Sequence, residues 1–128
     1  MPGFELFGAE EKKEVNDVLE TGILMRYGFD GPRKGIWKSK ELEAAVCSTF
    51  GSQYAQLTSS GTAALTTAMA ALGVGAGDEV IMPSFTFVAS FEAILSMGAI
   101  PVLVDIDESL TLSPAAVKAA ITPKTKCV

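Results

Sequence analysis

The sequence predicts an α/β fold with three layers, αβα, in which a mainly parallel sheet is covered by helices on both faces. Two observations favour this class. Apolar runs near residues 79 and 100 are each followed by a segment with helical periodicity, and this alternation is typical of βαβ units. About half of the 128 residues are apolar (48%), which is enough for a buried core at this length.

The first 50 residues predict two helices with an irregular segment between them. Residues 9–20 have an amphipathic helical pattern, and Gly22 follows where a left-handed C-cap is favourable. Residues 23–37 are rich in glycine and aromatic residues and fit neither helical nor strand periodicity. A second helix is expected over residues 39–50, with Gly51 as its stop.

The remainder predicts strands and helices in alternation. Strands are expected at "YAQLT" (residues 54–58), "EVIM" and "IPVLV". The first is followed by a helix with one apolar stripe, made of Leu65, Ala68, Met69 and Leu72. The second helix ends at Gly98, and the third has Ser113 as N-cap and Pro114 in its first turn, which is a strong helix start.

The last residues, "KTKCV", predict the beginning of a fourth strand. A strand that stops so early lacks both length and a covering helix, so the chain is expected to be truncated. The expected organisation is an N-terminal helix and irregular arm over residues 1–37, followed by a partial large domain over residues 38–128.

Composition excludes several classes of function. The formal charge of −5 and the scattered basic residues argue against a nucleic-acid partner. No segment is apolar for long enough to span a bilayer, so no membrane partner is expected. Cys47 and Cys127 form no CxxC motif, which disfavours zinc and disulfide frameworks and fits a reducing, cytoplasmic compartment. The absence of histidine excludes a Ser-His-Asp triad within the chain.

The turn "SSGT" at residues 59–62 is the main candidate site. It lies between a predicted strand and a predicted helix, where backbone N–H groups and the helix dipole favour an anion. Gly61 allows close backbone approach, and Ser59, Ser60 and Thr62 add hydroxyl donors. The alternative is an ordinary helix N-cap with no ligand, and the local sequence leaves both open.

A second loop is expected on the same side of the sheet. Ligands of open α/β sheets bind outside the carboxyl ends of the strands, and "PSFTFVAS" follows the strand at "EVIM". Phe85 and Phe87 are candidates for an aromatic face beside a flat ring, with core packing as the alternative for either.

Other motifs carry less weight. There is no GxxxxGK[ST] motif, and "GVGAGD" at residues 73–78 ends a helix, which is the reverse of a dinucleotide fingerprint. Asp105, Asp107 and Glu108 are expected to form a solvated loop without a metal ion.

Taken together, "SSGTAAL", "GAGDEVIMPSFTFVAS", "GAIPVLVDID" and "LSPAAVKAAITPKTK" resemble the N-terminal part of the DegT/DnrJ family of sugar aminotransferases, and the likeness extends over nearly the whole chain. These are fold-type-I enzymes that use pyridoxal 5'-phosphate (PLP). The resemblance implies that Ser60, Gly61 and Thr62 bind the cofactor phosphate and that Phe87 stacks on the pyridine ring.

The resemblance also implies an activity. An amino group would pass from an amino acid, with glutamate expected, to a keto-sugar, in a homodimeric enzyme. The Schiff-base lysine and the acid paired with the pyridinium nitrogen are expected beyond residue 128. Lys118, Lys124 and Lys126 do not match that lysine, so no catalytic residue is assigned and the 128 residues alone are expected to be inactive.

Two departures from the family pattern are informative. Glu92 stands where many members have asparagine, and "RYGFDGPRKGIWKSKELE" is longer than the usual short link. The longer link and the opening "MPGFELFG" are similar to enzymes that aminate the octulosonate sugar of lipopolysaccharide. Residues 25–37 are expected to contribute to sugar selectivity.

Three further expectations stay open. A PLP-dependent sugar dehydratase on the same scaffold and a non-catalytic phosphate-binding or interaction module are the alternative functions. In the family fold, strands from later sequence separate the first strand from the second and third. The 128 residues alone are therefore expected to rearrange or to associate through exposed sheet edges.

Overall fold

The computed structural model describes residues 3–128 of a chain that divides into two compact units, residues 1–57 and residues 58–128. The first unit includes α3 (Lys38–Phe50). The domain boundary expected at residues 37/38 stays a prediction. Within residues 3–128, no helix combines the length and the apolar composition that crossing a bilayer requires.

The second unit contains a three-stranded parallel sheet. Its strands are β1 (Glu79–Pro83), β2 (Ile100–Val104) and β3 (Thr125–Cys127), in the spatial order β2-β1-β3. β1 lies in the centre, and its Glu79 is opposite Ile100 on β2 and Thr125 on β3. The predicted strands at "EVIM", "IPVLV" and "KTKCV" are therefore confirmed.

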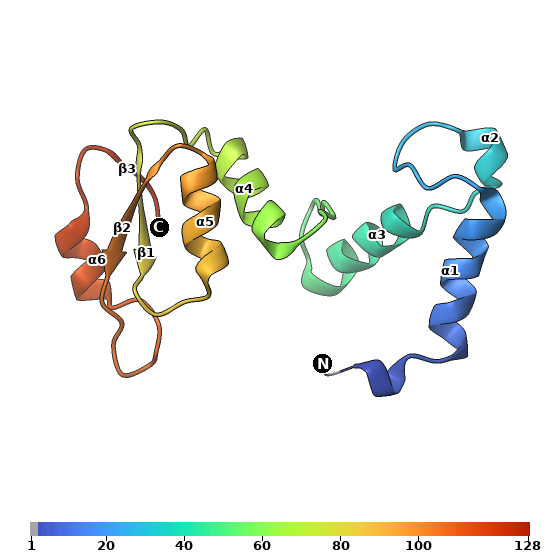
Figure 1. Ribbon diagram of the computed structural model, residues 1–128, viewed down its shortest axis with the longest axis horizontal. Coiled ribbons are helices and arrows are strands. Elements are labelled where there is room, and N and C mark those ends of the chain that lie inside the picture. Colours follow the sequence, from blue (N-terminus) through green and yellow to red (C-terminus); the bar gives the residue numbers. More distant parts are fainter. Residues whose placement is uncertain (1–2) are drawn as a thin grey trace. The chain divides into compact units, whose positions relative to one another are not determined.

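Helices cover both faces of this sheet. Parallel neighbours require crossover connections, which here are α5 (Val88–Ser96) between β1 and β2 and α6 (Pro114–Ala120) between β2 and β3. Figure 1 shows α5 and α6 on opposite faces, with α4 (Gly61–Ala71) packed beside α5. The predicted three-layer α/β class is confirmed.

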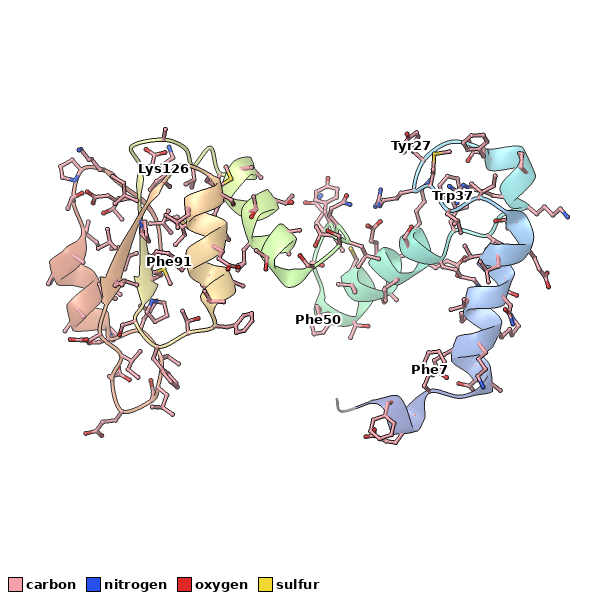
Figure 2. All side chains as sticks on the ribbon, in the orientation of Figure 1. Phe7, Tyr27, Trp37, Phe50, Phe91 and Lys126 are labelled. Carbon is pink, nitrogen blue, oxygen red and sulfur yellow. The ribbon has the colours of Figure 1, made fainter. Side chains whose placement is uncertain are left out.

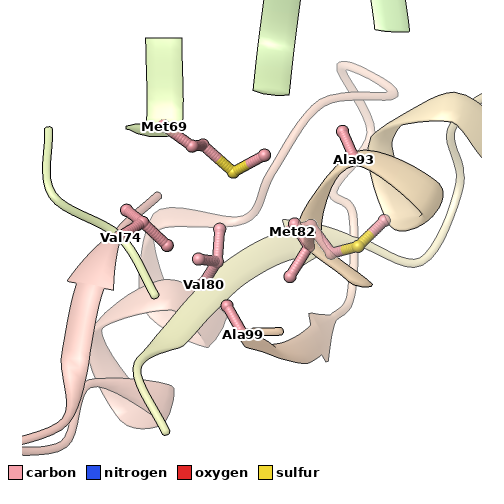
Figure 3. Close-up of a cluster of buried hydrophobic side chains, with 7 residues drawn as sticks. Met69, Val74, Val80, Met82, Ala93 and Ala99 are labelled. Carbon is pink, nitrogen blue, oxygen red and sulfur yellow. The ribbon is translucent and has the colours of Figure 1, made fainter. Parts of the chain in front are cut away.

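The core of this unit lies between β1 and the helices α4 and α5. Figure 3 shows Val80 and Met82 of β1 in one cluster with Met69, Ala93 and Ala99. Ile81 lies between Val80 and Met82 in the strand, so its side chain points to the opposite face, where it is fully buried. Of the apolar stripe predicted on α4, Met69 is buried, whereas Leu65 and Leu72 are exposed.

The strand predicted at residues 54–58 is not formed. These residues have no regular secondary structure, and the N–H of Leu57 donates to the Glu43 carboxylate (2.8 Å) instead of to a neighbouring strand. A strand is stabilised by the hydrogen-bond ladder with its neighbour. The sheet within residues 3–128 contains β1, β2 and β3 only, so residues 54–58 have an apolar strand pattern without a partner.

The first unit is helical. Its elements are the 3-10 helix η1 (Phe4–Leu6) and the α-helices α1 (Ala9–Thr21), α2 (Asp30–Arg33) and α3 (Lys38–Phe50). Gly22 and Gly51 end α1 and α3 with φ values of 68° and 69°, the left-handed conformation that glycine adopts without strain. Both predicted helix stops are confirmed.

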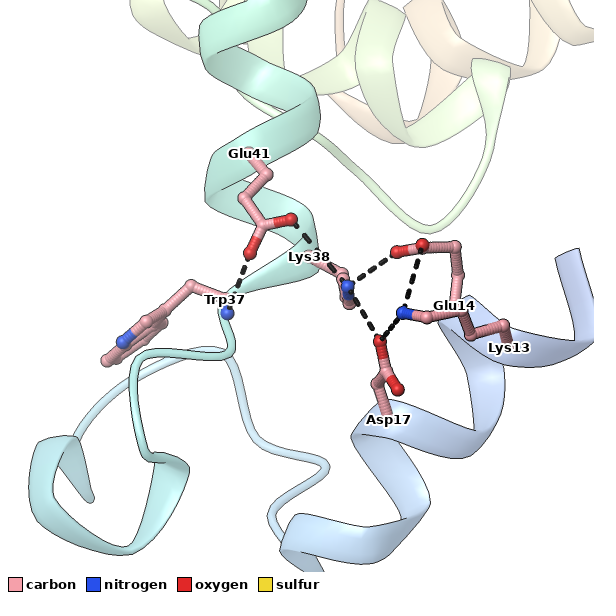
Figure 4. A network of polar contacts seen from close by, with 6 residues as sticks. All are labelled: Lys13, Glu14, Asp17, Trp37, Lys38 and Glu41. Atoms are coloured by element: carbon pink, nitrogen blue, oxygen red, sulfur yellow. Dashed lines mark hydrogen bonds and ion pairs between the residues drawn. The ribbon is translucent and has the colours of Figure 1, made fainter. Parts of the chain in front are cut away.

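An ion-pair network joins α1 to the start of α3 (Figure 4). The Lys38 ammonium is 2.5 Å from the Glu14 carboxylate and 3.2 Å from Asp17, and Lys13 is 2.8 Å from Asp17. The lysines hold the pKa of Asp17 below its ordinary value of 3.8, first through the Lys13 hydrogen bond and then through that of Lys38. The network therefore connects two helices that lie about twenty residues apart in sequence.

Replacing Ile81 tests the core. We expect Ile81→Ala to lower the free energy of unfolding by about 2–5 kcal/mol and Ile81→Val by about 0.5–1.5 kcal/mol, because each leaves a cavity of different size. Urea unfolding followed by circular dichroism measures both. Leu103→Ala, at an exposed position of β2, is the matched control and should cost much less. Equal losses at both positions would contradict the assignment of Ile81 to the core.

The ion-pair network predicts a pH dependence. Because the pKa of Asp17 is lower in the folded chain, its contribution is present above about pH 3.8 and is lost as the pH falls through the folded pKa. We expect Asp17→Asn to lower the melting temperature at neutral pH and to match the wild type at about pH 2. Glu20→Gln, at an exposed carboxylate of α1, should show no such loss. A deficit of Asp17→Asn that is independent of pH would refute the electrostatic explanation.

Candidate functional site

The turn "SSGT" forms the start of α4. Ser60 is the N-cap, with extended backbone, and its hydroxyl oxygen accepts a hydrogen bond from the Ala63 N–H (3.1 Å). Its carbonyl accepts from the Ala64 N–H (3.0 Å). The helix-cap interpretation of the turn is therefore correct as far as Ser60 is concerned. It does not exclude a ligand, because a helix start has more free N–H groups than one cap can satisfy.

Two backbone donors remain at this helix start. Among residues 3–128, neither the Gly61 N–H nor the Thr62 N–H has an acceptor. They occupy the first two helical positions of α4, where N–H groups point out of the helix and the dipole adds partial positive charge. This arrangement favours an oxyanion such as a phosphate.

Gly61 leaves open space beside these donors. A Cβ built at Gly61 would meet no atom within 4 Å. Gly61 also does not have the positive φ of the glycines that end α1 and α3. Neither packing within the chain nor backbone conformation therefore requires glycine here, and the space that a Cβ would fill is available to a ligand.

The aromatic residues after β1 are both exposed. Phe87 is the N-cap of α5 and is 78% exposed, and Phe85 is exposed as well. The alternative that either packs in the core is therefore wrong. Nearby, the hydroxyls of Thr86 and Ser90 are hydrogen-bonded to each other (3.1 Å). An exposed phenyl ring at a helix start can stack on a planar ring.

The helix starts of α4 and α5 lie toward the same side of the second unit. Their other ends approach each other, because the segment after α4 and the segment after α5 meet at Ala76 and Gly98. In Figure 1, α4 and α5 both begin toward the side of the second unit where β1 and β2 end. Among residues 3–128, no hydrogen bond joins residues 60–62 to Phe87, so the two parts share a side without direct polar contact.

The acidic loop after β2 is organised by its own hydrogen bonds. The Asp107 carboxylate accepts from the hydroxyl (2.5 Å) and the N–H (2.9 Å) of Ser109, and these donors, the hydroxyl first, lower its pKa. The Asp105 carbonyl accepts from the Ser113 N–H (3.2 Å) at the start of α6. These contacts support the interpretation as a solvated loop that leads into the Ser113 cap.

The lysines of the second unit lie on other elements. Lys118 is on α6, and Lys126 is on β3 (Figure 2). Lys124 precedes β3, where its carbonyl accepts from the Glu79 N–H (2.9 Å). None of them is at the start of α4 or α5.

The structure also reveals a polar framework in the first unit that sequence reasoning missed. Arg33 is only 5% exposed, and its guanidinium donates to the carbonyl of Gly28 (2.9 Å) and to that of Met25. Two cations lie over the Trp37 ring, Arg33 at 4.1 Å and Lys40 at 3.5 Å from its centroid. The segment that looked irregular in sequence is thus organised around Arg33.

Glu43 is the second part of this framework. Its Oε1 accepts hydrogen bonds from Arg26 and from the Leu57 N–H. These two donors, the Leu57 N–H first and Arg26 second, lower the pKa of Glu43 below its ordinary value of 4.5. No spacing in the sequence relates Glu43 to either partner, which lie 17 and 14 residues away.

Comparison with known proteins identifies the family. Residues 6–128 match the model of the DegT/DnrJ/EryC1/StrS aminotransferase family. The chain belongs to this family.

Solved structures agree with this assignment. S. venezuelae DesV, in complex with a ketimine intermediate, is 35% identical over 95% of this chain with a TM-score of 0.82. 3-Amino-5-hydroxybenzoic acid synthase is 36% identical over 94% (TM-score 0.84). Spr1654 of Streptococcus pneumoniae, provisionally assigned as a sugar aminotransferase and determined in its PLP form, is 35% identical over 89% (TM-score 0.71). The chain spans 31%, 30% and 28% of these proteins, respectively.

The cap at the start of α4 can be tested by itself. We expect Ser60→Ala to lower the free energy of unfolding by about 0.5–2 kcal/mol, because the Ala63 N–H loses its acceptor, and Ser60→Gly to cost only a few tenths. Chemical denaturation measures the difference. Ser59→Ala, at the exposed neighbouring serine, is the control and should have little effect. Equal effects at both serines would contradict the capping role.

Proposed function

We propose that this chain is the N-terminal, cofactor-phosphate part of a PLP-dependent aminotransferase that transfers an amino group from an amino acid to a keto-sugar. The proposal rests on the groups found at the start of α4, together with the membership of the chain in this family. Two backbone N–H groups without acceptors, a hydroxyl at Thr62 and open space at Gly61 occur there together.

The residues present fit the cofactor. The N–H groups of Gly61 and Thr62 and the Thr62 hydroxyl would donate to phosphate oxygens, and the dipole of α4 would add partial positive charge. Ser60 would keep the helix start in place through its bond to the Ala63 N–H. The exposed ring of Phe87 would stack on the pyridine ring. When bound, the cofactor supplies the electron sink that amino transfer requires.

The substrate part of the proposal rests on the first unit and on the family resemblance. We infer that residues 25–37 contribute to selection of the sugar, with glutamate as the amino donor. An ordered backbone around the buried Arg33 carries exposed side chains such as Tyr27 (Figure 2), which suits recognition of a polar ligand. The similarity of this segment to enzymes that aminate the octulosonate sugar of lipopolysaccharide favours a sugar of surface glycans.

The remaining catalytic groups are placed outside residues 1–128 in this proposal. Lys118 and Lys126 lie on α6 and β3, and Lys124 lies in the turn between them. That placement supports leaving all three without a catalytic role.

A cytoplasmic homodimer completes the proposal. Several large apolar side chains of the second unit are exposed, among them Leu72 and Leu103, as expected of surfaces that further structure covers.

Substitutions at Thr62 and Phe87 test the cofactor site. In the full-length protein, we expect Thr62→Ala and Phe87→Ala each to weaken PLP binding roughly tenfold, because a hydrogen bond to a charged group or a stacking contact is lost. Titration of the protein with PLP, followed by absorbance, measures the affinity.

The chain offers a matched control for each variant. Thr67→Ala changes an exposed threonine one turn further along α4, and Phe85→Ala changes the exposed phenylalanine two residues before Phe87. Both should bind PLP like the wild type. If Thr62→Ala and Phe87→Ala retain wild-type affinity, the proposed phosphate and stacking contacts are wrong.

A further inference from the structure

The ring of Phe87 is oriented by its backbone and not by packing. Its side chain is 78% exposed, so neighbouring side chains do not fix the ring. A ring that stacks on a ligand loses freedom on binding, and a backbone that already has the required conformation lowers this entropic cost. The orientation of Phe87 therefore depends on the hydrogen bonds of residues 84–90.

On its strand side, the loop between β1 and α5 is anchored to the sheet. The Ser84 N–H, directly after β1, donates to the Val104 carbonyl at the end of β2 (2.9 Å). Phe85 follows this anchor, and among residues 3–128 neither its N–H nor its carbonyl has a hydrogen-bond partner. The bond to the sheet therefore fixes the beginning of the loop and does not extend to the aromatic residues.

On its helix side, the loop is anchored through Ser90. The Ser90 N–H donates to the Phe87 carbonyl (3.1 Å), and the Ser90 hydroxyl is hydrogen-bonded to the Thr86 hydroxyl (3.1 Å). Ser90 thus binds the residue before Phe87 with its side chain and Phe87 itself with its backbone. The two bonds close a loop over residues 86–90, which contains Phe87 and leaves Phe85 outside.

Ser90 is held in place by the core of the second unit. It is half-buried and follows the buried Ala89. Ala93, one turn further along α5, is fully buried in the cluster of Figure 3. The start of α5 therefore has a defined position on the sheet, and the two bonds of Ser90 extend this order to Phe87.

We propose that Ser90 is a positioning residue, which together with Thr86 holds Phe87 in the orientation for stacking on the cofactor ring. This inference rests on the proposed function, from which it takes the stacking role of Phe87. Ser90 and Thr86 act through Phe87 and need no contact with the cofactor. Their bonds also give a physical reason for assigning the stacking to Phe87 and not to the exposed Phe85, which lies outside the bonded loop.

Removal of either hydroxyl tests the proposal. In the cofactor-free full-length protein, we expect Ser90→Ala and Thr86→Val each to raise amide hydrogen exchange at Ser90, because its bond to the Phe87 carbonyl opens more often. In titrations with PLP, both should weaken binding roughly threefold, as for the loss of one hydrogen bond. Ser90→Thr keeps a hydroxyl and should behave like the wild type in both measurements. Unchanged exchange at Ser90, or raised exchange with wild-type PLP affinity, would contradict the positioning role.

Combination with Phe87→Ala separates positioning from general damage. If Ser90 acts through the ring, Ser90→Ala costs no further PLP affinity in the Phe87→Ala background, since the two effects are not additive. Ser96→Ala is the matched control, because it removes a hydroxyl at the other end of α5, where Ser96 contacts the Thr66 hydroxyl (3.3 Å). It should leave PLP affinity unchanged. Additive losses in the double variant, or an equal loss in Ser96→Ala, would overturn the proposal.

The outcome also distinguishes this inference from the proposed function. If Phe87→Ala weakens PLP binding whereas Thr86→Val and Ser90→Ala do not, the stacking stands and the positioning role is wrong. If Phe87→Ala binds PLP like the wild type, the stacking is wrong and the positioning role is wrong with it. Thr62→Ala then still decides whether the turn at the start of α4 binds the phosphate.

Discussion

Parallel pairing of β1 with both β2 and β3 is the constraint on which the second unit depends. Parallel neighbours cannot be joined by tight turns, so each crossover carries a helix back across the sheet. Every such helix then begins near the carboxyl ends of the strands. The exposed Phe87 lies at a helix start of this kind, because α5 is the crossover from β1 to β2. Gly61 and Thr62 begin α4, which follows residues that form no strand. The topology thus places the aromatic part of the candidate site before any side chain is considered.

The elements that the sequence predicts correctly are determined by residues at their own ends. Gly22 and Gly51 end helices because of their own backbone freedom, and Ser113 with Pro114 begins one. Residues 54–58 show where local signals are not sufficient. Their apolar pattern is that of a strand, but a strand exists only with a neighbour, and residues 3–128 form a sheet without this segment. Pairing is a property of the whole fold and is not encoded in five residues.

The candidate site also has a part that the sequence predicts, and the first unit has a polar framework that the sequence does not predict. Residue types and spacing single out the turn "SSGT" and the pair Phe85 and Phe87, and the family resemblance selects Phe87, the aromatic after "PSFT", for stacking. The framework of Arg26, Arg33 and Glu43 has no such signal. Its bonds join residues up to 17 positions apart, and two of them end on backbone groups of Met25 and Gly28, which any residue type would offer. Only the structure shows that Arg33 is buried and that Glu43 accepts hydrogen bonds from two donors.

At the start of α4, stability and binding use different groups. Ser60 satisfies the third N–H of the helix through Ala63, and this bond is sufficient to begin the helix in a defined place. The N–H groups of Gly61 and Thr62 contribute nothing to that cap, and a larger residue at Gly61 would fit the space beside it. Folding alone therefore does not require the glycine, whereas free N–H donors occur at every helix start. A phosphate at this turn requires both, since its oxygens need the donors and its volume needs the open space. The same reasoning applies to Phe87, whose exposure stabilises no core but leaves a ring face for a planar ligand.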